Sequence, residues 1–189
     1  MPVLSDRVGT FTDSVIRRMT RINNQYDSIN LSQGFPDFDP PPQLLDALAK
    51  TAYNGPHQYA VTFGAQNFRE ALAKKTSPAL HHEVDPNTEV CVTCGGTEAM
   101  MAAMMTICNP GDKVMIFSPF YENYGADAIL SGAEPIYIPL VPPTYEFDIS
   151  LIEKGFAEGA KALILCNPSN PCGKVFRRDE LEAIAKLAI

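Results

Sequence analysis

Three short stretches of the chain gather residue types that can hold a small molecule. They read CGGTEAM (94–100), SPFYENY (118–124) and NPSNPCG (167–173). Glycine lets a backbone pass close to a ligand, aromatic rings offer flat surfaces, and a proline restricts the residue before it and so fixes the direction of an asparagine amide. Each stretch also has an explanation without a ligand, as a tight turn, as core packing or as an ordinary Asn-Pro loop.

The first of these stretches suits an anion. Gly95 and Gly96 precede a helix that we expect to open at about Thr97. The start of a helix points unpaired backbone N–H groups and a positive dipole end at one spot, where a phosphate fits, and Thr97 can add its hydroxyl. The stretch is neither a dinucleotide fingerprint, which needs G-x-G-x-x-G, nor a P-loop, which needs Gly-Lys-Ser/Thr.

The other two stretches suit a flat, polar ring. Phe120, Tyr121 and Tyr124 are candidates for a platform against a planar ligand, because they lie where a strand-like run ends and a helix begins. Asn170 lies between two prolines, so its amide can donate to a ligand acceptor from a fixed direction. Together with the phosphate cradle, these residues describe a flat, phosphorylated, phenol-like ligand.

The elements that must position these stretches alternate along the chain. Apolar, strand-like runs lie at 89–93, 113–117, 134–138 and 161–165, and helix-like stretches at 97–108, 121–131, 148–157 and 179–189. This order predicts an α/β fold with a mostly parallel sheet and helices on both faces. Ligands of such sheets bind beyond the carboxyl ends of the strands, so the three stretches are expected to meet at one edge.

The first part of the chain reads differently. Residues 1–43 form an N-terminal arm and a Pro- and Asp-rich connector, and Thr12 or Asp13 is expected to cap a short helix in the arm. Helical spacing then appears over 44–53 and again from Asn67 onward.

Composition limits the class of protein. The 189 residues are 46% hydrophobic and 20% charged, as in a globular protein, and the net charge of −7 with scattered basic residues disfavours nucleic acid as a partner. We expect no signal peptide and no membrane span, hence a cytoplasmic protein. The five cysteines fit reduced thiols; Cys91 and Cys94 have C-x-x-C spacing but lack the second pair that a zinc site needs, so no metal is expected.

Several of these motifs, in this order, resemble a known family. The chain is similar to the class I/II aminotransferases of the pyridoxal 5′-phosphate (PLP) fold type I group, in their kynurenine/methionine aminotransferase-like branch. The resemblance is carried by NLSQGFPDF (30–38), HQYAVTFG (57–64), VTCGGTEA (92–99), SPFYENY (118–124) and NPSNPCGKVF (167–176). The family would make 1–43 an arm and substrate-side connector, and 44–189 an incomplete PLP-binding large domain, the first half of the fold type I large domain.

The resemblance also assigns roles to matching positions. Gly95, Gly96 and Thr97 would hold the phosphate of PLP, Tyr121 would stack on its ring, and Asn170 would hydrogen-bond its phenolic oxygen and face the substrate. Gly34 would lie against the substrate carboxylate, and Tyr59 would reach the phosphate in the neighbouring protomer of a homodimer. The prolines matching Pro119 and Pro171 tend to follow cis peptide bonds in the family. Cys94 and Cys172 depart from its usual residues, which are Ser or Asn and Thr.

Three functional groups of the family have no match in the chain. These are the Schiff-base lysine, the carboxylate that keeps the pyridine nitrogen protonated, and the arginine that binds the substrate carboxylate, all of which the family places after residue 189. We therefore expect an N-terminal part of an enzyme that moves an amino group between an amino acid and a 2-oxo acid, inactive by itself. Two alternatives stay open: a catalytically silent PLP-binding or dimerisation module, and a PLP-dependent C–S lyase.

Overall fold

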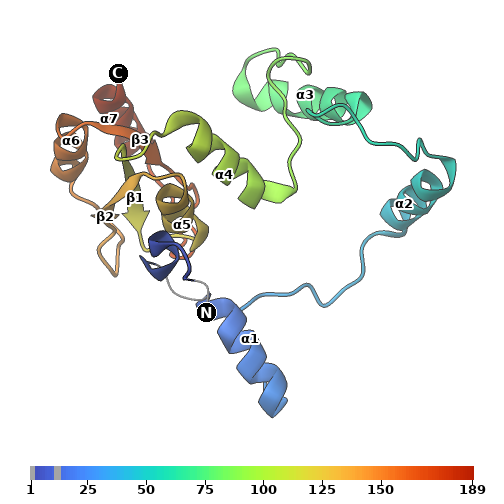
Figure 1. Ribbon diagram of the computed structural model, residues 1–189, viewed down its shortest axis with the longest axis horizontal. Coiled ribbons are helices and arrows are strands. Elements are labelled where there is room, and N and C mark those ends of the chain that lie inside the picture. The colour runs from blue at the N-terminus through green and yellow to red at the C-terminus, as the bar shows by residue number, and fades with distance from the viewer. Residues whose placement is uncertain (1–2, 11–13) are drawn as a thin grey trace. The chain divides into compact units, whose positions relative to one another are not determined.

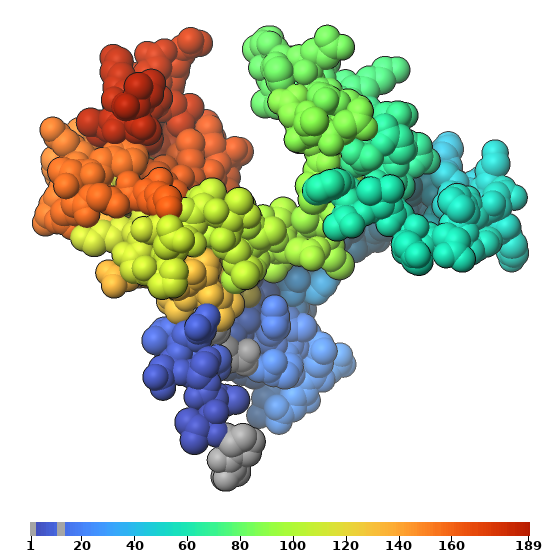
Figure 2. All heavy atoms as spheres, turned by 45° about the horizontal axis from the view of Figure 1, so that its top comes forward, coloured from blue at the N-terminus to red at the C-terminus, as the bar shows by residue number. Residues whose placement is uncertain are grey.

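The computed structural model of the chain describes residues 3–10 and 14–189. They fall into two units. The helical unit covers Asp13–Thr93, and the sheet unit covers Cys94–Ile189 together with the short 3-10 helix η1 (Asp6–Thr10). In Figure 2 the yellow, orange and red atoms of the sheet unit form one continuous body.

A parallel sheet lies at the centre of the sheet unit. Its strands are β1 (Lys113–Ser118), β2 (Glu134–Pro139) and β3 (Ala160–Ile164), in the order β2-β1-β3. The helices of the unit are α4 (Gly95–Ile107), α5 (Asn123–Leu130), α6 (Ile149–Ala157) and α7 (Arg178–Ala188). Parallel neighbours need crossover connections, and α5 lies in the connection from β1 to β2 and α6 in that from β2 to β3.

The central strand β1 is covered on both faces because its apolar side chains alternate. Val114 and Ile116 pack with residues of α4 and α5, among them Met104. Met115 and Phe117 point the other way and pack with residues of α6 and α7. Figure 1 shows the strands between α5 on one side and α6 and α7 on the other. The predicted α/β class, with a parallel sheet and helices on both faces, is confirmed.

The register of β3 against β1 contains one irregularity at its amino end. Lys113 pairs with Ala160 and Val114 with Ala162, so Lys161 bulges out of the ladder. Its ammonium lies 2.9 Å from the Asp112 carboxylate. From Val114 onward the pairing is regular, and the carboxyl ends of the two strands are in register.

The prediction of a strand over 89–93 is wrong. These residues carry no strand and belong to the helical unit. The Val92 backbone N–H donates instead to the carbonyl oxygen of Phe63, at 3.0 Å. An apolar run becomes a strand only where a neighbouring strand pairs with it, which is a condition that the local pattern does not contain.

Over residues 14–93, the helical unit consists of three helices and their connections. They are α1 (Val15–Tyr26), α2 (Pro42–Asn54) and α3 (Gln66–Leu80). Ser14 caps α1, since its hydroxyl accepts from the Arg17 backbone N–H at 3.3 Å. The predicted caps Thr12 and Asp13 lie outside the described residues.

Arg69 anchors α3 within the helical unit. Its side chain is buried, and it donates to the carbonyl oxygens of Gly64 at 3.1 Å and Pro86 at 2.6 Å.

Among residues 3–10 and 14–189, no helix combines the length and the apolar character that crossing a lipid bilayer requires.

Candidate functional site

Three of the predicted site residues line one pocket in the sheet unit. Gly96 and Thr97 reach it from the start of α4, and Tyr121 from the connection between β1 and α5. Met100, Asn123 and Tyr124 complete the lining, and the cavity measures about 320 Å³. This volume lies at the lower end of the range typical of small-molecule sites.

The start of α4 provides the open backbone that an anion requires. The helix begins at Gly95, earlier than predicted, so both glycines lie in its first turn. Gly95 has φ +80°, a conformation that residues with a side chain rarely adopt. Apart from the adjoining residues and the backbone of α4 itself, no atom lies within 4 Å of the position that a Cβ would take at Gly95 or Gly96, so this turn is bordered by open space.

A glutamate stabilises this turn. The carboxylate of Glu98 accepts a hydrogen bond from the Cys94 backbone N–H. Glu98 is also the acidic residue of the first turn, where it interacts favourably with the helix dipole. This hydrogen bond links Cys94, before the two glycines, to Glu98, after them, and so holds the turn of Gly95 and Gly96 in place.

The three aromatic residues of SPFYENY have different surroundings. Phe120 stacks on Tyr137 of β2, with ring centroids 5.2 Å apart and planes within 4°. Tyr121 and Tyr124 line the pocket and meet edge to face, at 5.8 Å and 76°. Core packing therefore explains Phe120, while Tyr121 and Tyr124 are the rings that a ligand in the pocket would contact.

Asn170 lines a second, smaller pocket beside the first. This pocket lies at the carboxyl ends of β1 and β3, and Tyr124 lines both. Asn170 is exposed and follows the buried Ser169. Tyr124 is thus the link between the pocket of Gly96, Thr97 and Tyr121 and the pocket of Asn170.

The Asn-Pro loop is held by its own hydrogen bonds. Ser169 N–H donates to the Lys174 carbonyl at 2.8 Å, and Gly173 N–H donates to the Ser169 carbonyl at 2.7 Å. The side chain of Asn167 accepts from the Phe176 N–H at 3.0 Å. The side chain of Asn167, the first asparagine of the motif, therefore holds the loop in place, while that of the second, Asn170, lines the pocket.

The expected cis bonds before Pro119 and Pro171 are present.

Tyr124 also interacts with a cysteine of this loop. A hydrogen bond with Cys166, together with burial, raises the pKa of Tyr124 to about 12. The Cys166 thiol itself donates to the Pro168 carbonyl at 3.3 Å. Tyr124 therefore stays neutral throughout the physiological pH range and keeps its hydroxyl proton.

Two predicted residues lie in the other unit of the chain. Gly34 and Tyr59 belong to the helical unit, and both are exposed, Tyr59 at 95%. Their roles toward substrate and partner subunit stay predictions.

Sequence reasoning missed Asn123 as a site residue. Its amide nitrogen donates to the Thr97 hydroxyl at 2.8 Å, which joins the starts of α5 and α4 at the pocket. The available signal was its place inside SPFYENY, a stretch that we considered only for its aromatic rings. Met100, one helical turn after Gly96, was missed as well, and its spacing along α4 would have indicated the same face.

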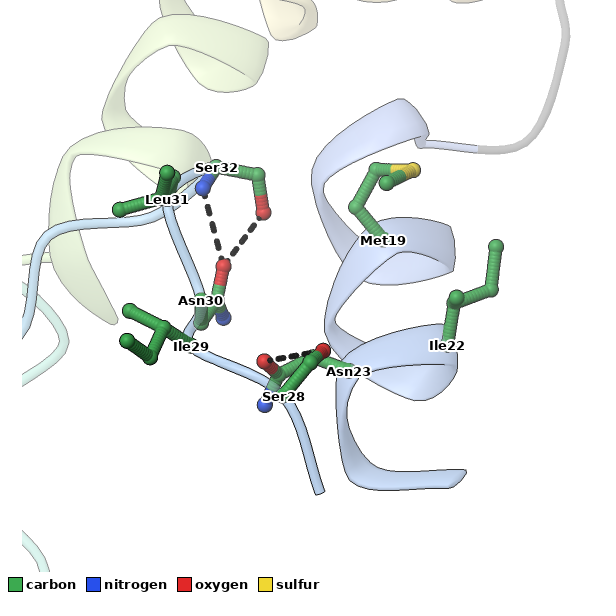
Figure 3. Close-up of a pocket in the computed structure, with 8 residues that line it drawn as sticks. All are labelled: Met19, Ile22, Asn23, Ser28, Ile29, Asn30, Leu31 and Ser32. Carbon is green, nitrogen blue, oxygen red and sulfur yellow. Dashed lines mark hydrogen bonds between the residues drawn. The ribbon is translucent and has the colours of Figure 1, made fainter. Parts of the chain in front are cut away.

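The helical unit contains a separate cavity of about 350 Å³. Figure 3 shows it between α1 and the following segment, where Ser28 contacts Asn23 and where Asn30 accepts from both the N–H and the hydroxyl of Ser32. The cavity contains none of the predicted site residues.

Comparison with known proteins identifies the family. Residues 26–188 match the family model of aminotransferase class I and II. The chain is 35% identical to the methionine aminotransferase of Escherichia coli K12, across 90% of this chain and 44% of that protein. It is 34% identical to human kynurenine–oxoglutarate transaminase 1, across 88% of this chain and 43% of that protein.

A solved structure agrees with these sequence relatives. The N-succinyldiaminopimelate aminotransferase of Mycobacterium tuberculosis superposes with a TM-score of 0.90 at 34% identity, over 99% of this chain and 49% of that one. The chain spans about half the length of the proteins it matches. The matched residues 26–188 include most of both units of the structure, and the chain therefore belongs to the aminotransferase class I and II family.

Proposed function

We propose that this chain is part of a PLP-dependent aminotransferase, which moves an amino group between an amino acid and a 2-oxo acid, and that its sheet unit binds PLP. The observation that carries the proposal is the shared pocket of Gly96, Thr97 and Tyr121, joined through Tyr124 to the pocket of Asn170. The membership of the aminotransferase family supports it.

The residues of the site fit the chemical groups of PLP. The open first turn of α4 and the Thr97 hydroxyl suit the phosphate, because helix starts favour anions. The Tyr121 ring suits the face of the pyridine, and the amide of Asn170 suits the phenolic oxygen as a donor. When bound, PLP supplies an electron sink for the substrate.

This chain's own residues would bind and orient the cofactor. The phosphate contacts would fix its position, the aromatic contact would fix the plane of its ring, and Asn170 would fix its rotation within that plane. Orientation of this kind lowers the barrier of a reaction without contributing a reacting group. The 189-residue chain is accordingly proposed to be inactive by itself.

Three lysines of the sheet unit have partners of their own. Lys113 pairs with Glu158 at 3.5 Å and Lys161 with Asp112 at 2.9 Å. Lys174 is buried and pairs with Glu180 at 3.0 Å. These partners support the proposal that none of the three is the lysine to which the cofactor is attached.

Several finer assignments belong to the same proposal. Gly34 would contact the substrate carboxylate, and Tyr59 would reach the phosphate bound by the partner subunit of a homodimer. Residues 1–43 would serve as arm and connector, and 44–189 as part of the PLP-binding large domain. All five cysteines are free, as in proteins of the reducing cytoplasm, which is the compartment that we propose.

The substrate is proposed only as a class. The relatives act on chemically different amino acids, since one is a methionine aminotransferase, one a kynurenine–oxoglutarate transaminase and one an N-succinyldiaminopimelate aminotransferase. We therefore propose only the two classes of substrate, an amino acid and a 2-oxo acid.

The proposal is tested by two measurements. In the first, the affinities of the chain for PLP and for pyridoxal are compared, and we expect PLP to bind reversibly and more tightly than pyridoxal. In the second, the chain is incubated with PLP and reduced with borohydride, and its intact mass is expected to show no stoichiometric pyridoxyl adduct. A stoichiometric adduct on one lysine of residues 1–189 would refute the assignment of the missing lysine. Equal affinity for PLP and pyridoxal would refute the phosphate site.

A further inference from the structure

We infer that Asn123 is a positioning residue, which directs the hydroxyl proton of Thr97 toward the phosphate of the cofactor. The inference rests on the proposed PLP site and adds a residue to it. Asn123 is the first residue of α5, and it lines the same pocket as Thr97, Gly96 and Tyr121.

A hydrogen bond joins the side chains of Asn123 and Thr97. The Asn123 Nδ2 donates to the Thr97 Oγ1 at 2.8 Å, a normal length for a good hydrogen bond. A threonine hydroxyl has one proton to donate and two lone pairs that accept. Because the Asn123 amide donates to one of these lone pairs, the Thr97 hydroxyl does not donate its own proton to Asn123. That proton points to another acceptor.

The position of Thr97 determines which acceptor that is. A threonine inside a helix ordinarily donates to the carbonyl four residues before it, as Thr106 of α4 does toward Ala102 at 2.7 Å. Thr97 lies in the first turn and borders the open pocket, on the side where backbone N–H groups favour an anion. A phosphate oxygen at this place would therefore receive the Thr97 proton.

Asn123 also strengthens the donor that it orients. Hydrogen bonds in a chain polarise one another, so a hydroxyl that accepts from an amide donates more strongly. The route from Asn123 through Thr97 to the phosphate is such a chain. Its contribution should appear only when the ligand carries a phosphate.

The test compares two ligands that differ in that group alone. The 189-residue protein is titrated calorimetrically with pyridoxamine 5′-phosphate and with pyridoxamine, neither of which has the aldehyde that reacts with surface lysines. We expect Asn123→Ala to weaken binding of the phosphorylated ligand roughly three- to tenfold, the size of one hydrogen bond, and to leave pyridoxamine binding unchanged. Melting temperatures show whether each variant remains folded.

Two further variants separate orientation from simple packing. In Asn123→Asp the side chain can only accept and carries a negative charge, so it draws the Thr97 proton away from the ligand and also repels the phosphate, and we expect a larger, phosphate-specific loss. In a Thr97→Val background, Asn123→Ala should have no additional effect, because the chain is already broken. Thr106→Val is the matched control on the same helix and should change neither affinity.

The outcomes distinguish this inference from the proposed function. If the unmodified protein prefers the phosphorylated ligand but Asn123→Ala affects both ligands equally, or neither, the positioning role is refuted and the PLP site stands. If the effects of Asn123→Ala and Thr97→Val are additive, Asn123 does not act through Thr97. If the unmodified protein shows no preference for the phosphorylated ligand, the proposed site itself is refuted, and the inference with it.

Discussion

Gly95 and Gly96 are adjacent, yet a methyl group should affect them in opposite ways. Gly95 has φ +80°, so Gly95→Ala should lower the free energy of unfolding by about 1–2 kcal/mol through backbone strain. Gly96 has no such restriction and lies in α4, so Gly96→Ala should leave the stability unchanged or raise it by as much as about 1 kcal/mol. Urea denaturation measures both changes.

The same pair of variants probes the phosphate site. The new Cβ of Gly96→Ala enters the pocket that Gly96 lines, so binding of pyridoxamine 5′-phosphate should weaken about tenfold although the protein is no less stable. A variant that is fully stable and binds normally would show that no ligand approaches the backbone there.

Tyr124 should be the last tyrosine to ionise. Its hydrogen bond with Cys166 and its burial raise its pKa from 10.0 to about 12. Because the folded-state pKa is the higher one, this contribution to stability is complete below pH 10 and is lost as the pH rises from about 10 to about 12. Phenolate absorbance during an alkaline titration should show one of the seven tyrosines ionising late.

The cause of this shift can be checked with two cysteine variants. Cys166→Ala should lower the pKa of Tyr124 toward its ordinary value, because it removes the hydrogen bond that contributes most. Cys172→Ala alters another half-buried cysteine of the same loop and should leave the titration as it was. An unchanged titration in Cys166→Ala would mean that burial alone causes the shift.

Among the elements, α7 depends on a buried ion pair at its start. Lys174 and Glu180 are 7% and 8% exposed and lie 3.0 Å apart, and the Glu180 carboxylate also accepts from the Arg177 N–H at 2.7 Å. Glu180→Ala should lower the free energy of unfolding by about 3–5 kcal/mol, because it leaves Lys174 buried without its nearest carboxylate. Thermal unfolding of the 189-residue protein measures the loss.

An exposed pair on the same helix provides the control. Arg178 and Glu182 lie 2.9 Å apart but are largely solvated, so Glu182→Ala should cost less than about 1 kcal/mol. Equal losses in Glu180→Ala and Glu182→Ala would show that burial does not set the strength of these pairs.

The elements also show which parts of the fold local sequence determines. The runs 113–117, 134–138 and 161–165 became strands because each found a parallel partner: β1 pairs with both β2 and β3, and these two pair with β1. The run 89–93 has the same pattern and is no strand, because pairing partners are a property of the fold and not of the run. Helix starts shifted by one or two residues, since side-chain caps such as Glu98 move them.

The site was predictable to a similar degree. Glycine pairs, strand-end aromatics and Asn-Pro steps have recognisable composition, so Gly96, Thr97 and Tyr121 could be selected, and the structure brings them to one pocket. Asn123 was not selected although it lies inside SPFYENY, because its role arises from a side-chain contact 26 residues away, with Thr97. Contacts of this kind leave no local pattern.

For the molecule as a whole, net charge should control association. The protein carries a charge of −7 at pH 7 and has a sequence pI near 4.9, while many large apolar side chains of α1 and α2 are exposed. Charge repulsion keeps such surfaces apart, so lowering the pH from 8 toward 5 should increase light scattering at low salt. Scattering that is independent of pH would mean that these apolar surfaces do not associate.

The irregular pairing at Lys161 lies at the end of the sheet opposite to the candidate site. The shift is absorbed within the first residues of β1 and β3, before the strands reach the loops of Tyr121 and Asn170. Protein engineers who wish to attach a label or lengthen a connection should therefore choose the turns that enter the strands, at 109–111 or 158–159. A peptide inserted there would leave the opposite rim of the sheet undisturbed.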